Sequence, residues 1–398
     1  MTPGPGIART FLPKGFLAGG INSGVRKYRP DLGVIVSDVD AVAAGVFTLN
    51  TCKAAPVLYS QGMLPSTHIR AIITNSGQAN AATGPEGRER NWQMALATAK
   101  AVGCLPHQVL TASTGKIGEA LDIEKIVPVI PEMVERAEDT AEPFAVSILT
   151  TDLVPKTATT EVQLSGGKVR ITGICKGSGM IHPNMATMLG YLLTDAAIPV
   201  GVVQTLLTDA ANVSFNMISV DGDMSTNDCV FMMANGASGV GLANDSDMAA
   251  FKSALNNLSI LLAKSIARDG EGATKLIEVN LRGVADEKIA RQAARGITLS
   301  PLIKSAIHGE DPNWGRILAR LGAEGITAEA LDRMALSIQG TKIFEKGAPV
   351  AFDRGEVRKQ LKTATVVIDA DFFSGSHQAQ AWGCDLSKKY VEINTEYS

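Results

Sequence analysis

The chain has 398 residues, of which 45% are hydrophobic and 19% are charged, and its formal net charge is −3. These values are typical of a globular enzyme with a large buried core, and they exclude a fibrous or disordered chain. The slightly acidic balance gives no basic surface, so nucleic acid is not an expected partner. The length predicts two or more domains, or one large sandwich.

The cysteines and the apolar runs indicate where the protein resides. The five cysteines are far apart in the sequence, at Cys52, Cys104, Cys175, Cys229 and Cys384. An odd number without close spacing fits reduced thiols better than a disulfide framework or a zinc cluster. The first residues lack the apolar core of a signal peptide, and no apolar run is long enough to span a bilayer. We therefore expect a mature cytoplasmic protein with no membrane partner.

Strand-like runs alternate with helical stretches through the first part of the chain. Strands are expected at 32–40, 43–50 and 69–77, where Val, Ile and Phe are bounded by Gly and Asn. Apolar residues at helical spacing predict helices at 89–102 and 246–267. Gly270 suits the left-handed position just past the end of the second helix, and an alternating strand follows at 274–283.

The character of the sequence changes at about residue 285. A short helix at 285–297, the polar turn HGEDPNWGR, two more β-type runs and the tail YVEINTEYS follow. This pattern predicts an α/β protein with a large domain over about 1–284 and a smaller α/β domain over about 285–398.

Several motifs fall short of the sites that they imitate. STGKIG has only the tail of a phosphate-binding loop, and GASGVGLAN lacks a strand-turn-helix frame. Acidic and polar residues alternate in DGDMSTND as in a calcium loop, at Asp221, Asp223, Ser225 and Asn227. The Gly and Glu that such a loop needs at positions six and twelve are missing, so a solvated or capping turn is the better interpretation. The five histidines show no ligand spacing, and no metal site is predicted.

The segment KGSGMIHPNMATMLGYLLTDA holds one small hydroxyl, Thr187, between a glycine-rich turn and a Met-rich run that reads as an apolar helix. A threonine in a buried helix is usually only a tolerated small residue. However, the stretch from Gly177 to Pro183 can hold a distorted backbone, and the small side chain of Ala186 leaves its carbonyl accessible. The Thr187 hydroxyl can then attack that carbonyl, shift the acyl group from nitrogen to oxygen, and split the chain.

Such a cleavage gives Thr187 a free α-amine. An unperturbed α-amine has a pKa of about 7.7–8.0, so a fair fraction is neutral near neutral pH. The amine can serve as general base for the hydroxyl of the same residue. One residue then supplies both nucleophile and base, which accounts for the lack of a catalytic histidine or a Ser-His-Asp pattern.

The cleavage segment KGSGMIHPNMATML resembles that of the ornithine acetyltransferases, also called glutamate N-acetyltransferases, of the arginine pathway. The resemblance covers nearly the whole chain in the family's order, through GVFTLNTCKAAPV, NSGQANAATG, ASTGKIG, TTDLVPK, FNMISVDGDMSTND, IARDGEGATKLIEV, SPLIKSAIHGEDPNWGRI and GCDLSKKYVEINTEY. It implies an αββα sandwich with a smaller C-terminal α/β domain. It also implies cleavage between Ala186 and Thr187 into an α chain (1–186) and a β chain (187–398), assembled as an α2β2 heterotetramer.

The resemblance further implies a reaction and a set of site residues. Thr187 takes the acetyl group of N2-acetylornithine and passes it to the α-amine of glutamate in a ping-pong reaction, without metal or organic cofactor. Thr114 and Gly115 correspond to the oxyanion-stabilising pair, where one donor contributes about 2.7–4 kcal/mol. The implied substrate-binding residues, besides Thr187 itself, are Thr150, Thr151, Lys176, Glu271 and Asn394.

Purely structural interpretations of these residues stay open at this point. Thr114 and Gly115 fit a helix cap followed by a turn, and Glu271 fits a solvated loop charge. The family's tail continues past the tyrosine with two hydroxyl residues, whereas this chain stops at Ser398, directly after Tyr397. Either the second hydroxyl is missing, or Ser398 and its terminal carboxylate replace it in substrate binding.

Three other functions remain open. A self-cleaving amidase or aminopeptidase of the same architecture would pass the acyl group to water. A related transferase could act on other acetylated amino acids in a specialised pathway. An uncleaved binding or scaffold protein would lack the chemistry, although the presence of Thr187, Thr114 and Lys176 argues against it. No motif separates enzymes that also use acetyl-CoA as co-substrate from those that do not.

Overall fold

The computed structural model describes residues 9–182 and 188–396, and the chain divides into two compact units. The first unit comprises Met1–Gly177, Asn184–Phe215 and Met224–Leu262. The second unit comprises Ser178–Pro183, Asn216–Asp223 and Ala263–Ser398. The expected domain limit near residue 285 and the expected products 1–186 and 187–398 stay predictions.

One eight-stranded mixed sheet forms the first unit, in the order β4-β3-β2-β9-β7-β6-β5, with β1 also paired to β2. Its strands are β1 (Phe16–Ile21), β2 (Leu32–Phe47), β3 (Ser66–Gln78), β4 (Val109–Lys116), β5 (Lys156–Leu164), β6 (Gly167–Lys176), β7 (Leu189–Thr194) and β9 (Cys229–Ala234). β3 and β4 are parallel, as are β7 and β9, and the other pairs are antiparallel.

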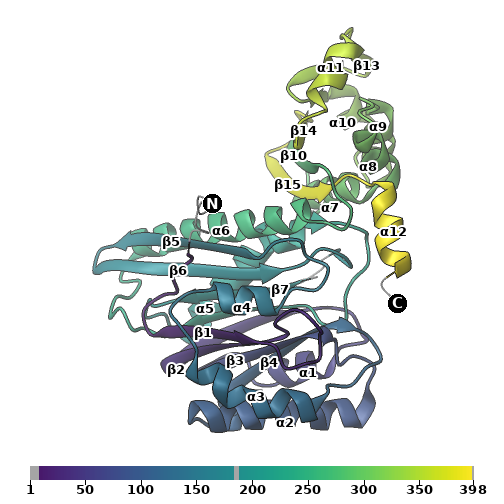
Figure 1. Cartoon of the computed structure of the whole chain (residues 1–398). Helices are drawn as coiled ribbons and strands as arrows, with labels where there is room; N and C mark the ends of the chain where they lie inside the picture. The colour runs from purple at the N-terminus through teal and green to yellow at the C-terminus, as the bar shows by residue number, and fades with distance from the viewer. Residues whose placement is uncertain (1–8, 183–187, 397–398) are drawn as a thin grey trace, which may run out of the picture. The chain divides into compact units, whose positions relative to one another are not determined.

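The long strand β2 joins two layers of this sheet. Its first residues pair with β1 and β3, and its last six, Val42–Phe47, pair with β9. Register shifts on both sides of Ala41 mark the bend between these two parts. The two strands expected at 32–40 and 43–50 are therefore one bent strand, and the sheet folds over itself (Figure 1).

Helices cover both outer faces of the folded sheet. The helices that belong wholly or mostly to the first unit are α1 (Ala55–Gln61), α2 (Gly84–Val102), α3 (Ile123–Glu135), α4 (Glu142–Ser147), α5 (Val200–Val213) and α6 (Asp245–Arg268). α2 and α3 bury Met94 and Ile130 against Val34 and Ile73 of the β1–β4 layer. α6 lies over β6, where a Cβ on Gly173 would come within 2.5 Å of Leu262. This layering confirms the expected αββα sandwich.

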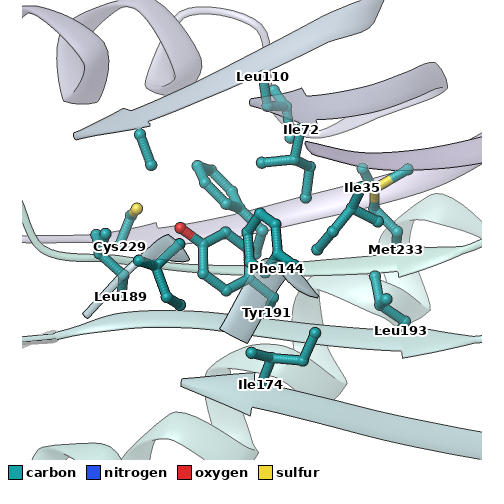
Figure 2. Close-up of a cluster of buried hydrophobic side chains, with 14 of the residues drawn as sticks. Ile35, Ile72, Leu110, Phe144, Ile174, Leu189, Tyr191, Leu193, Cys229 and Met233 are labelled. Atoms are coloured by element: carbon teal, nitrogen blue, oxygen red, sulfur yellow. The ribbon is translucent and has the colours of Figure 1, made fainter. Parts of the chain in front are cut away.

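A hydrophobic core fills the space between the two sheet layers (Figure 2). Ile72 and Leu110 enter it from one layer and Ile174 from the other. Between them, Phe144 of α4 meets Tyr191 of β7 edge to face, with ring centroids 4.8 Å apart. Alternate residues of each strand point into this core. A residue that lies two positions after a core residue in the same strand therefore points to the same side, nearer the end of the core.

The residues after the expected cleavage junction form a strand, so the prediction of a Met-rich helix there is wrong. All six residues of β7 are buried, and the strand lies between β6 and β9 inside the sheet. A short apolar run without polar alternation suits a buried strand and a buried helix equally, so periodicity could not separate them.

The second unit contains a seven-stranded sheet in the order β13-β12-β11-β14-β10-β15-β8. The strands are β8 (Ile218–Ser219), β10 (Leu276–Val284), β11 (Ala335–Ile338), β12 (Thr341–Glu345), β13 (Ala348–Pro349), β14 (Thr365–Asp371) and β15 (His377–Cys384). The helices are α7 (Glu287–Leu299), α8 (Pro301–His308), α9 (Trp314–Ala323), α10 (Ala328–Arg333), α11 (Arg354–Gln360) and α12 (Lys388–Glu396).

Most expected elements of this unit are confirmed. The strand expected at 274–283 is β10, and the helix expected at 285–297 is α7, whose start is capped by the Asp286 carboxylate, which accepts the Ile289 N–H at 2.9 Å. The expected left-handed Gly270 is wrong, because the residue with positive φ after α6 is Gly272, at +70°. Among the described residues, no helix combines the length and apolar character needed to cross a bilayer.

Candidate active site

Lys176 and Thr114 come together at one end of the inter-layer core. Lys176 ends β6 two residues after the core residue Ile174, and Thr114 stands two residues after Ala112 in β4. Strand alternation therefore points both side chains into the same space. The Lys176 ammonium donates to the Thr114 hydroxyl at 3.3 Å and to the Thr150 hydroxyl at 2.6 Å. Three of the expected site residues thus lie in direct contact.

Gly115 occupies a position that only glycine can fill. It pairs with Gly77 across the parallel strands β3 and β4, and its φ is +136°. A Cβ at Gly115 would lie 2.2 Å from the carbonyl carbon of Gly77. Thr114 and Gly115 therefore form the end of a strand, and the alternative reading as a helix cap is wrong.

Asp152 connects the residues of this cluster, and sequence analysis missed it. Its side chain is fully buried and accepts the N–H of Gly177 at 2.7 Å and that of Thr150 at 3.1 Å. It also forms ion pairs with the ammonium of Lys156 at 2.8 Å and with that of Lys176 at 3.6 Å. The only signal in the sequence was its place within TTDLVPK, which the resemblance had marked for its threonines.

The lysines keep Asp152 ionised despite its burial. Burial alone would raise the pKa of this carboxyl, but Lys176, Lys156 and the Gly177 N–H together hold the pKa well below its usual range. Asp152, Lys156 and Lys176 consequently carry one net positive charge among them. Arg26, which donates to the carbonyls of Leu149 and Thr150, adds a second cation close by.

Two residues of the DGDMSTND stretch lie buried in the first unit. The Asn227 amide donates to the carbonyl of Ala79 at 2.5 Å and to that of Ser113 at 2.9 Å, and so fixes the residue before Thr114. Asp228 is 3% exposed, and its Oδ2 has no hydrogen-bond partner among the described residues. Burial raises the pKa of Asp228 well above its ordinary value, although Ser225 and Lys176 act in the opposite direction. Of the two interpretations of this stretch, a solvated or a capping turn, the solvated turn does not describe Asn227 and Asp228, which are buried.

Glu271 and Asn394 form a pair within the second unit. The Asn394 amide donates to the Glu271 carboxylate at 2.8 Å and to the carbonyl of Tyr390 at 3.0 Å. The backbone N–H of Glu271 donates to the Ser178 carbonyl at 3.1 Å. A Cβ on Gly179 would lie 2.3 Å from the Glu271 carboxylate, so this glycine allows the close approach.

Asp221 holds the glycine-rich segment that leads toward the expected junction. Its carboxylate accepts the N–H of Met180 at 2.6 Å and that of Ile181 at 2.9 Å. Met180 has a φ of +56°, which is uncommon for a residue with a side chain. Burial raises the pKa of Asp221, whereas the backbone N–H groups lower it. Asp221 therefore caps backbone N–H groups, as the interpretation of this stretch as a capping turn predicts.

Three of the expected site residues lie outside the described part of the chain. They are Ala186, Thr187 and Ser398. Thr151 is described and is half-buried between Thr150 and Asp152. Among the described residues, no cluster of His, Cys, Asp and Glu could hold a metal ion.

Comparison with known families decides the classification. The model of the ArgJ family matches residues 17–398. The chain belongs to the ArgJ family. The resemblance to the ornithine acetyltransferases is thereby confirmed, and with it the enzyme class: the chain is an acyltransferase of arginine biosynthesis.

Relatives of this family match the chain along nearly its full length. The arginine biosynthesis bifunctional protein ArgJ of Dehalococcoides mccartyi is 44% identical over 97% of this chain and 96% of its own. The chloroplastic ArgJ protein of Oryza sativa subsp. indica is 45% identical over 97% of this chain and 86% of its own. The crystal structure of argJ from Bacillus halodurans is 41% identical, with a TM-score of 0.51, and covers 53% of this chain and 100% of that chain.

Proposed function

We propose that the chain cleaves itself between Ala186 and Thr187 and then transfers acetyl groups from N2-acetylornithine to glutamate through an acetyl-Thr187 intermediate. The observation that carries the proposal is the cluster at the end of β6, where Lys176 contacts both Thr114 and Thr150 beside the constrained Gly115. Membership in the ArgJ family supplies the reaction class.

Cleavage requires no group beyond the junction and water. The Thr187 hydroxyl attacks the Ala186 carbonyl, and the C–N bond breaks as the acyl group moves to oxygen. Water then hydrolyses the ester, which leaves a carboxylate on Ala186 and a free α-amine on Thr187. The solved chain from Bacillus halodurans, matched in full by 53% of this chain, has about the length that one such product would have.

Acetyl transfer then proceeds in two halves. The α-amine of Thr187 accepts the hydroxyl proton while Oγ attacks the acetyl carbonyl of N2-acetylornithine. The tetrahedral oxyanion is stabilised by hydrogen bonds from Thr114 and Gly115, and the ornithine amine leaves with the proton. The α-amine of glutamate attacks acetyl-Thr187 in the second half, and the threonine hydroxyl is restored.

The charge of the first-unit cluster suits an anionic partner. The Lys176 ammonium lies 3.6 Å from the Asp152 carboxylate and donates to the hydroxyls of Thr114 and Thr150, so it presents a cation beside two hydroxyl groups. We assign Lys176, with Thr150 and Thr151, to the α-carboxylate of the substrate. A lysine ammonium is a good point-charge partner for a carboxylate, and its own burial strengthens the attraction.

Glu271 and Asn394 are assigned to the other end of the donor substrate. Glu271 offers a carboxylate for the side-chain ammonium of ornithine, and the Asn394 amide holds that carboxylate at 2.8 Å. Ser398 is also assigned to substrate binding.

The remaining parts of the proposal concern co-substrate, assembly and location. Acetyl-CoA is proposed as a second acetyl donor, in keeping with the word bifunctional in the relatives' names. The cleaved chains are proposed to form an α2β2 heterotetramer. All five cysteines are free, which supports a cytoplasmic location.

The proposal is tested by intact-mass measurement and by an acetyl-transfer assay. The wild-type protein should give two fragments that meet at Ala186 and Thr187, whereas Thr187→Ala should stay as one chain. The matched control is Thr205→Ala on α5, where the lost hydroxyl donates to the Gly201 carbonyl within the same helix; this variant should cleave normally. Purified wild type should then form N-acetylglutamate from N2-acetylornithine and glutamate.

Two results would contradict the proposal. A folded wild-type chain that stays intact would remove the nucleophile and favour a scaffold protein. A cleaved chain that releases acetate to water at the same rate with and without glutamate would identify an amidase.

A further inference from the structure

The loop that carries Glu271 is fastened to the start of the tail helix by one carboxylate, Asp385. Asp385 follows β15, and its side chain is fully buried. Its carboxylate accepts three hydrogen bonds from the loop: the N–H of Thr274 at 2.7 Å, the hydroxyl of Thr274 at 2.5 Å, and the N–H of Lys275 at 2.8 Å. The Asp385 N–H also donates to the Lys275 carbonyl at 3.1 Å, so the backbone of Asp385, as well as its side chain, is bonded to the loop.

Further contacts join the Glu271 loop to the tail helix α12. The Ser387 hydroxyl donates to the carbonyl of Gly272 at 2.6 Å. A Cβ on Gly272 would lie 2.5 Å from the backbone nitrogen of Tyr390, so the loop and the helix are in backbone contact. One helical turn later, Asn394 reaches the Glu271 carboxylate. A shift of the loop against the helix would therefore change the position of Glu271 relative to Asn394.

His308, at the end of α8, is the fourth partner of Asp385. Its Nδ1 lies 2.7 Å from Oδ2 of Asp385, and the ring is 39% exposed. Burial by itself raises the pKa of Asp385. Hydrogen bonds from the Thr274 hydroxyl, His308 and the two N–H groups lower it by more than burial raises it, so the pKa lies below its ordinary value. Asp385 is thus a carboxylate whose acceptor capacity is used by the loop and by His308.

We infer that Asp385, held by His308, is a positioning residue that sets the place of the Glu271 carboxylate and thereby the preference of the enzyme for a donor with a side-chain ammonium. The inference rests on the proposed function, in which Glu271 binds that ammonium. Asp385 acts through the loop and touches no reacting atom. Its effect should therefore appear in substrate preference and not in the chemistry of acetyl transfer.

The test compares two donors that differ in one group. N2-acetylornithine carries the side-chain ammonium, and N-acetylnorvaline has the same carbon chain without it. For wild type, kcat/KM should strongly favour N2-acetylornithine. Asp385→Asn keeps the size of the side chain but weakens its hydrogen bonds to the loop, so this preference should fall roughly tenfold or more, mainly through the KM for N2-acetylornithine. The rate with N-acetylnorvaline should stay within about twofold of wild type.

His308 variants provide a milder, independent perturbation. His308→Ala removes the donor and should lower the preference by roughly threefold, whereas His308→Asn keeps an N–H near the place of Nδ1 and should retain it. The matched control is Asp353→Asn in the same unit, where a carboxylate accepts the N–H groups of Gly355 and Glu356 at the start of α11. This variant should leave the preference unchanged.

The outcomes separate the inference from the proposed function. A proportional loss with both donors in Asp385→Asn would mean general damage to the unit and would overturn the inference. An unchanged preference in Asp385→Asn and His308→Ala would also overturn it, and if Asp385→Asn fails to fold, His308→Ala and its His308→Asn rescue decide. A wild-type enzyme that transfers acetyl from neither donor would instead contradict the proposed function.

Discussion

Asp152→Asn should destabilise the first unit strongly, although the two side chains have nearly the same shape. The carboxylate is fully buried and has four partners: two backbone N–H groups and the ammonium groups of Lys156 and Lys176. Each hydrogen bond from a charged group contributes about 1.5–3 kcal/mol, and asparagine recovers part of this with its single oxygen. Breaking a buried ion pair from one side typically costs about 3–5 kcal/mol, which we expect here in the free energy of unfolding.

The pH dependence of this loss has a definite sign. The pKa of Asp152 is lowered in the folded protein, so its stabilising contribution is complete above the ordinary Asp pKa of about 3.9. The contribution is lost as the pH falls below that value toward the folded pKa. The difference in stability between wild type and Asp152→Asn should therefore be largest at neutral pH and should narrow below about pH 4.

Urea unfolding followed by circular dichroism, at pH 7 and at several lower values, measures both effects. The matched control is Asp247→Asn, because Asp247 accepts the N–H and hydroxyl of Ser165 and forms no ion pair with a lysine in the described structure. The decrease in the free energy of unfolding at neutral pH should be clearly smaller for Asp247→Asn than for Asp152→Asn. A cost for Asp152→Asn equal to that of the control, or a gap that stays constant into the acid range, would refute the electrostatic reasoning.

Three further predictions concern neighbouring residues. Gly115→Ala should lower the acetyl-transfer rate by about 10²–10³-fold, because its Cβ would collide with Gly77, whereas Gly118→Ala, also at positive φ but with open space around it, should retain activity. Asp228→Asn should raise the free energy of unfolding at pH 8, since the raised pKa means that folding disfavours the ionised form of Asp228, and urea unfolding should show this gain shrink as the pH falls toward the ordinary Asp pKa of about 3.9. Asp221→Ala should slow cleavage, as followed by intact mass over time, because Met180 and Ile181 lose their common acceptor.

The sequence predicted most regular elements where their length made the period clear. The helix expected at 246–267 is α6, within one residue at each end, because its apolar stripe continues over about five turns, from Met248 to Ile266. The six-residue β7 was misassigned, because an all-buried run carries no alternation. The bend in β2 was also missed, since Asp38, Val39 and Asp40 read as a strand end while the pairing continues beyond them.

The candidate site was predictable only through family resemblance. Lys176, Thr114 and Thr150 are 26 to 62 positions apart in pairs, and nothing in their spacing shows that they meet. The roles of Asp152 and Asp385 are still harder to predict, because the sequence does not distinguish a buried carboxylate from a surface carboxylate. Their roles follow from which backbone N–H groups the fold brings to them.

The position of β7 and β9 inside the first sheet has a consequence for the order of folding and cleavage. β7 and β9 lie side by side between β6 and β2, so a cut before β7 would leave each product contributing interior strands to one sheet. Folding of the uncut chain is a unimolecular process, whereas refolding of the separated products would need two molecules to meet. The cleaved enzyme would thus form readily from the uncut chain but refold slowly from its separated products. The rate at which its native structure returns after removal of denaturant should depend on protein concentration, whereas that of uncut Thr187→Ala should not.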